Sequence, residues 1–119
     1  MRFLSMVMSS ESVRNDPPSE AMMQAVGELV GDAVKAGAIV DMGGLMPTAH
    51  GACVRLSGGK VSVIDGPFAE TREVVGGYAI FSLDSKEAAV EWAQRLMELH
   101  ILHMPGWEGE CHIRQIADA

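Results

Sequence analysis

Positive charge is scarce in this chain. Only 9 of its 119 residues are Lys or Arg, against 16 Asp and Glu, so the formal net charge is −7. The basic residues are scattered and form no stripe. Because phosphate contacts need clustered Lys and Arg, this composition argues against direct binding of nucleic acid. It equally disfavours an anionic membrane surface, so we expect neither kind of partner.

Long hydrophobic runs and cysteines are also rare. No apolar run approaches the length of a membrane span, and the stretch 3–8 is too short for the core of a secretory signal. The two cysteines, Cys53 and Cys111, have no CxxC spacing. Free thiols in a reducing cytoplasm are therefore the expectation, with a single disulfide between them as the open alternative.

Phosphate-binding glycine loops are missing as well. Gly43-Gly44 and Gly58-Gly59 belong to neither a GxGxxG nor a GxxxxGK pattern. The nine methionines are better explained as core filler than as a metal-binding cluster. The sequence thus predicts no cofactor, and neither the glycine pairs nor the methionines indicate a phosphate or metal site.

What is present is enough apolar material for a packed core. Apolar residues make up 48% of the chain, which suits one domain over residues 1–119. Apolar residues at helical spacing predict a helix over 20–36, with Ser19 as its N-cap. A second helix is predicted to begin at Asp84, where Glu87 would complete a capping box.

Strand-like runs alternate with these helices. They cover residues 3–8, 38–42, 53–56, 60–64, 77–83 and 110–116. The third and fourth runs flank Gly58-Gly59, which predicts a β-hairpin. The order predicts an α+β fold, a ferredoxin-like sandwich with an inserted hairpin and both helices on one sheet face. Tyr78 and Ile80 would lie on the opposite, open face, and homodimerisation is the simplest way to cover it.

The most informative stretch is Asp65-Gly66-Pro67-Phe68-Ala69-Glu70-Thr71-Arg72-Glu73, followed by Gly76-Gly77-Tyr78. Proline fixes its own φ and restricts the residue before it, so this run predicts a stiff corner. Phe68 is expected to anchor the corner in apolar surroundings. Asp65 is open to two interpretations, a general base at a cleft or a cap of the turn. Glu70 and Glu73 are also open to two interpretations, a chemical role at a cleft or simple neutralisation by a neighbouring arginine and water.

Histidine and arginine form the second group of candidates. His100 and His103 lie near the end of the second helix, where they could stabilise its C-terminus or act as general acid or metal ligand. On the last strand, alternation places His112 and Arg114 on one side. If Cys111 faces the helices, Arg114 points to the barrel interior, where it would bind a substrate carboxylate or an internal carboxylate.

The run that begins at Asp65 resembles the signature of DGPF proteins, which are part of the YCII-related family. Supporting similarities occur at 43–47, 54–60 and Arg114-Gln115. The resemblance implies a dimeric α/β barrel with a cleft near the signature, and a setting close to alternative sigma factors. A His–Asp pair suggested as catalytic for some members does not carry over, because residues 20–36 contain no histidine.

The leading hypothesis is a cytoplasmic bacterial homodimer with a small-molecule cleft beside the corner and acid/base chemistry. Asp65 would be base or orienter, and His100 or His103 the acid. The ligand-binding residues would be Arg114, Glu70, Glu73, Phe68 and Tyr78. The alternative is a non-enzymatic binding or regulatory module, with a sigma-factor-type protein as partner. The residues leave open whether the protein is an enzyme.

Overall fold

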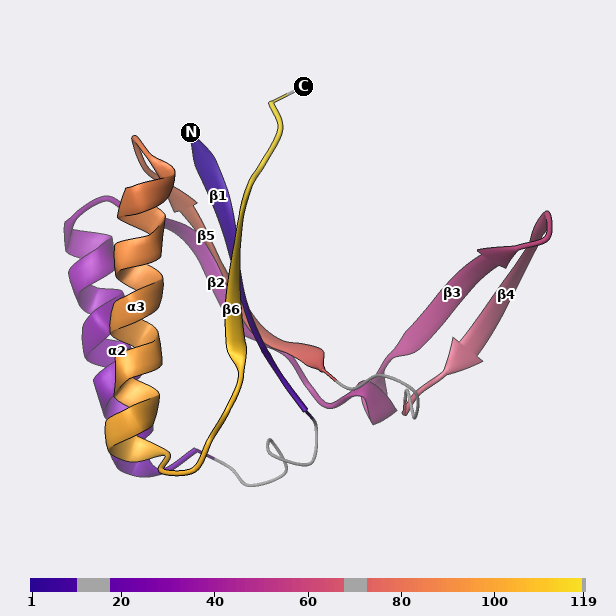
Figure 1. The fold of residues 1–119 in the computed structure, drawn as a ribbon, viewed down its shortest axis with the longest axis horizontal. Coiled ribbons are helices and arrows are strands. Elements are labelled where there is room, and N and C mark those ends of the chain that lie inside the picture. Colours follow the sequence, from indigo (N-terminus) through magenta and orange to yellow (C-terminus); the bar gives the residue numbers. More distant parts are fainter. Residues whose placement is uncertain (11–17, 68–72, 119) are drawn as a thin grey trace.

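The computed structural model describes residues 1–10, 18–67 and 73–118. One antiparallel sheet has the strand order β2-β5-β1-β6 and consists of β1 (Arg2–Ser9), β2 (Ile39–Gly44), β5 (Val74–Ser82) and β6 (Glu110–Gln115). The helices α2 (Glu20–Lys35) and α3 (Lys86–His103) lie side by side against one face of this sheet (Figure 1). A short 3₁₀ turn, η1 (Thr48–His50), precedes a separate hairpin of β3 (Ala52–Ser57) and β4 (Lys60–Asp65). The α+β class, the helices and the inserted hairpin are therefore confirmed.

Helix α2 begins and ends as its sequence predicts. The Ser19 hydroxyl accepts a hydrogen bond from the Met22 amide at 3.1 Å, which satisfies one of the amides that the first turn leaves free. At the other end Gly37 adopts a φ of 66°, and the Ala38 amide returns to the Ala33 carbonyl at 2.9 Å. These two caps fix where the chain enters and leaves the helix layer.

The start of α3 corrects the prediction at Asp84. The N-cap is Ser85, whose hydroxyl accepts from the Ala88 amide at 3.2 Å, and the helix begins at Lys86. Glu87 then follows the cap by two residues rather than three, so the predicted capping box does not form. Aspartate and serine are equally good caps, and the extended backbone of Ser85 decides between them.

The core lies between the sheet and the helices. The register pairs Phe3 with Phe81, and both side chains are buried on the helix-facing side. Phe81 packs with Ala33 and Ala38, and its ring stacks on Trp92 with the centroids 6.4 Å apart. Aromatic and small residues thus alternate across this layer, a pattern that joins both helices to the central strands.

The hairpin β3–β4 projects away from this core (Figure 1). The radius of gyration is 15.9 Å, whereas about 13.5 Å is typical of a compact chain of this length. Cross-strand pairing places four apolar side chains on one hairpin face, each between 67% and 74% exposed: Val54, Leu56, Val61 and Val63. A two-stranded hairpin with an uncovered apolar face is only marginally stable in water, so we expect another surface to cover this face.

The corner after β4 is held against η1. The Gly66 amide donates to the Gly51 carbonyl at 2.9 Å, and the Gly66-Pro67 peptide bond is cis. A Cβ atom at Gly66 would overlap the Thr48 carbonyl oxygen. Only glycine therefore fits the position between the hairpin and the proline.

Replacing Gly66 by alanine should lower the free energy of unfolding by about 1–3 kcal/mol, because backbone has to move to admit the methyl group. Urea unfolding followed by circular dichroism measures this. The control is Gly27→Ala in α2, where a Cβ meets nothing within 4 Å and helix propensity should add up to about 1 kcal/mol. Equal midpoints for Gly66→Ala and the wild type would contradict the close approach.

Candidate functional site

The sequence-predicted acid/base residues are placed on different elements. Asp65 is the exposed last residue of β4, while His100 and His103 lie on the last turn of α3. The hollows that have His100 on their walls do not include Asp65. Phe68 and Glu70 lie outside the described residues. Joint action of Asp65 with a histidine stays a prediction, since the described chain does not bring them to one cavity.

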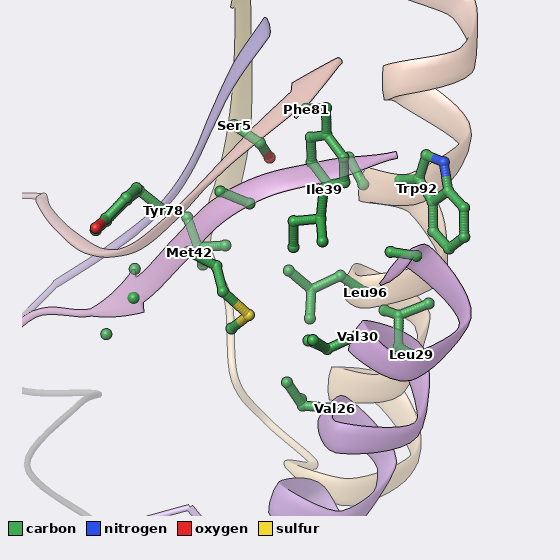
Figure 2. Close-up of a pocket in the computed structure, with 17 residues that line it drawn as sticks. Ser5, Val26, Leu29, Val30, Ile39, Met42, Tyr78, Phe81, Trp92 and Leu96 are labelled. Carbon is green, nitrogen blue, oxygen red and sulfur yellow. The ribbon is translucent and has the colours of Figure 1, made fainter. Parts of the chain in front are cut away.

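A cavity of about 270 Å³ lies instead between the helices and the sheet (Figure 2). Figure 2 shows aliphatic side chains of α2 and α3 pointing across it toward β2 and β5. They are Val26, Leu29 and Val30 of α2 and Leu96 of α3. Ile39 and Met42 of β2 lie opposite them, with the rings of Phe81 and Trp92 at one end. None of the described residues on its wall is Asp, Glu, His, Lys, Arg or Cys. The arrangement offers apolar contact and shape rather than proton transfer.

Two polar residues border this cavity, and both are already engaged. The hydroxyl of Ser5, a buried residue, lies 3.2 Å from the Cys111 sulfur. Tyr78 extends away from the helices, and its hydroxyl donates to Asp41 at 3.3 Å (Figure 2). The Tyr78 ring covers Gly43, where a Cβ would come within 3.0 Å of the ring. Tyr78 therefore belongs to the open sheet face, as the strand alternation predicts.

A second hollow, of about 500 Å³, lies beside the proline corner. Glu73, a predicted ligand-binding residue, is on its wall together with His50 from η1. His50 lies in a segment that the sequence indicates only as a connector, so no sequence pattern marks it as a site residue. His50 and Glu73 share this wall because η1 lies beside the start of β5, a contact between distant segments that no local pattern indicates.

His100 has a structural partner on each side. Its Nδ1 lies 2.9 Å from the Leu96 carbonyl, which can only accept, so Nδ1 carries the proton and donates. Its ring lies against Trp107, with the centroids 4.1 Å apart. The loop after α3 therefore fixes the orientation of this imidazole. His103, half-buried on the same turn, has no comparable contact among the described residues.

The last strand presents its side chains as predicted. Cys111 and Ile113 line a hollow with residues of α3, so they face the helices. His112 and Arg114 consequently lie on the open sheet face, where both are exposed. His112 Nε2 is 3.2 Å from a Glu110 carboxylate oxygen. Arg114 is thus placed where a second subunit or a ligand on that face would meet it.

Two absences concern the described part of the chain. Residues 1–10, 18–67 and 73–118 contain no cluster of three or more His, Cys, Asp or Glu that could hold a metal ion. Over the same ranges, neither helix is both long enough and apolar enough to traverse a bilayer.

Comparison with known proteins decides the family. The sequence model of the YCII-related domain matches residues 1–98. The chain belongs to the YCII-related domain family. A relative from Rhizobium meliloti, an uncharacterised protein, is 34% identical over 77 residues, which are 65% of this chain and 62% of the relative. The matched part of this YCII-related protein thus covers less than two thirds of that relative's length. The resemblance drawn from the Asp65 run is confirmed at the level of the family.

The single tyrosine of this YCII-related protein gives a direct test of its open face. The Asp41 charge raises the pKa of Tyr78, and burial and the Asp41 hydrogen bond act in the same direction. Tyr78 is the only tyrosine, so tyrosinate absorbance reports it alone. We expect Asp41→Asn to lower the Tyr78 pKa and Asp118→Asn to leave it unchanged. The folded state holds this proton more tightly than the unfolded state, so its contribution to stability should disappear as pH rises through the raised pKa. Identical titrations of wild type and Asp41→Asn would contradict the contact.

Proposed function

We propose that this YCII-related protein binds a small apolar molecule in the cavity between the helices and the sheet. The observation that carries the proposal is an internal space of about 270 Å³ with aliphatic and aromatic walls. In another protein, an engineered apolar cavity of about 150 Å³ stays dry and binds benzene. The larger space here suits a molecule with one substituted ring or a short branched chain. This favours the binding-module alternative over acid/base catalysis, because the described wall residues carry no carboxyl or imidazole group.

We further propose that two copies of the chain cover each other's apolar faces. The hairpin face defined by Val54, Leu56, Val61 and Val63 is exposed, and the open sheet face carries Leu4, Met6 and Ile80. A second copy offers a complementary apolar surface for each of these faces, and two-fold dimers are the commonest oligomers. This would build the dimeric α/β barrel that the family resemblance implies. It would also place Arg114 and Tyr78 at or near the subunit contact.

Filling the cavity tests the binding proposal. Ala33 lies buried on the cavity wall, and Ala33→Leu should reduce the affinity for butylbenzene at least tenfold, which corresponds to about 1.4 kcal/mol of lost contact. Isothermal titration calorimetry measures the affinity. Ala21→Leu, at an exposed position of the same helix, is the matched control and should bind like the wild type. Unchanged binding by Ala33→Leu would place the ligand elsewhere.

A charge on one hairpin face tests the dimer. Val63→Lys should convert a species of twice 12.7 kDa into one of 12.7 kDa, because a buried lysine in the contact would be unpaired. Sedimentation equilibrium measures the mass. Ser62→Lys puts the same charge on the other face of the same strand and should leave the dimer intact. A monomeric wild type, or equal dissociation by both variants, would refute this arrangement. A monomeric wild type would leave the hairpin face to the predicted sigma-factor-type partner.

A second candidate function is acid/base chemistry beside the proline corner. The observation in its favour is that His50 and Glu73 share the wall of the hollow of about 500 Å³ at that point. A histidine and a carboxylate on one wall are the groups that general acid/base catalysis uses. Under this candidate, His50→Ala abolishes turnover of a substrate while Ala33→Leu preserves it. If the apolar cavity is the site, Ala33→Leu weakens binding of butylbenzene and His50→Ala leaves it unchanged.

A further inference from the structure

The cavity continues into a groove along the N-terminal half of α2. This groove, of about 690 Å³, runs between α2, the end of β1 and the loop after α3. Cavity and groove share wall residues, among them Val26, Val30 and Leu96, which Figure 2 shows pointing into the cavity. A ligand in the cavity therefore has a path outward along this groove. The inference below rests on the proposed function, because the groove would hold the outer end of the same ligand.

The groove wall contains a hydroxyl that has no hydrogen-bond partner among the described residues. Ser9 is only 2% exposed, and its Oγ makes no hydrogen bond to any described residue. Strand alternation puts Ser9 on the helix-facing side with Ser5 and Val7, and it lines the groove. A buried polar group without a hydrogen bond is unfavourable, so most such groups in native proteins have a partner. A ligand atom in the groove would supply one.

His100 provides a second polar atom on the same wall. Its Nδ1 hydrogen is used by the Leu96 carbonyl, and in this tautomer Nε2 carries a lone pair. Contact with Trp107 holds the ring in place. Among the described residues nothing bonds to Nε2. The groove thus combines one hydroxyl, able to donate and accept, with one nitrogen that accepts.

The rest of the wall decides which chemical group fits. Among the described residues it contains no Lys, Arg, Asp or Glu, and Met22, Met23 and Met104 supply adaptable apolar surface. A carboxylate or ammonium head would lose water here without meeting an opposite charge. A hydroxyl group can accept from Ser9 and can donate to a ring nitrogen of His100, so its chemistry suits both residues on this wall. We propose that the ligand is an uncharged amphipathic alcohol or phenol, its hydroxyl in the groove at Ser9 and His100 and its apolar end in the cavity.

Two probes that differ by one hydroxyl test this proposal. Affinities of 4-butylphenol and butylbenzene are measured by calorimetry on the full chain. The wild type should bind the phenol about 3-fold to about 10-fold more tightly, which is the usual worth of a hydrogen bond. Ser9→Ala and His100→Phe should each remove much of this preference, taken as the ratio of the two affinities within each variant. Ser62→Ala, on the exposed face of β4, is the control and should keep the preference.

A stability measurement separates a ligand-binding role of Ser9 from a structural one. Because Ser9→Ala removes an unpartnered buried hydroxyl, the free variant should unfold at the same or a higher temperature than the wild type. A lower unfolding temperature would mean that the hydroxyl supports the fold and would overturn its assignment to a ligand.

The binding results also distinguish this inference from the proposed function. Equal wild-type affinity for both probes, or a phenol preference that survives Ser9→Ala, overturns the alcohol site, while butylbenzene binding still upholds the apolar cavity. Failure of both probes to bind overturns both. Phenol preference lost in Ser9→Ala and kept in Ser62→Ala supports both.

Discussion

The pairing of β1 with β5 on one side and with β6 on the other fixes which of its side chains face the helices, and the other features of the structure follow from this. It places Phe3, Ser5, Val7 and Ser9 toward the helices and leaves Leu4 and Met6 on the open face. A slip by one residue would exchange the two sets completely. Core, cavity, groove and open face all follow from this single alternation. The caps at Ser19 and Ser85 then set where the two helices lie above it.

The cavity exists because the layer facing the helices is built from residues of unequal size. Phe81 and Trp92 hold the helices off the sheet, while Ala33, Ala79 and Ala93 leave room beside them. Protein interiors are normally packed to crystal density, so a hollow of this size forgoes contacts that a ligand would restore. The open sheet face and the apolar hairpin face have the same character, because each leaves apolar surface without a cover. The proposed ligand and the proposed second subunit would each cover apolar surface that the single chain leaves uncovered.

Local patterns predicted the elements well, and the family membership agrees with the resemblance at Asp65. The Ser19 cap, the hairpin at Gly58-Gly59 and the opposite facing of Cys111 and His112 all depend on neighbours in sequence. The cap of α3 was misplaced by one residue because Asp84 and Ser85 have nearly equal capping ability. The cavity, the His50–Glu73 hollow and the unpartnered Ser9 hydroxyl depend on contacts between distant segments, which spacing does not encode.

Both binding proposals depend on an accessible apolar space between the helices and the sheet. Diffraction from a crystal of the full chain pressurised with xenon tests it most directly, because xenon enters dry apolar cavities. If the space is open to small apolar atoms, a xenon peak should appear among Leu29, Leu96 and Phe81. A crystal in which side chains close this space and no xenon peak appears there would contradict it.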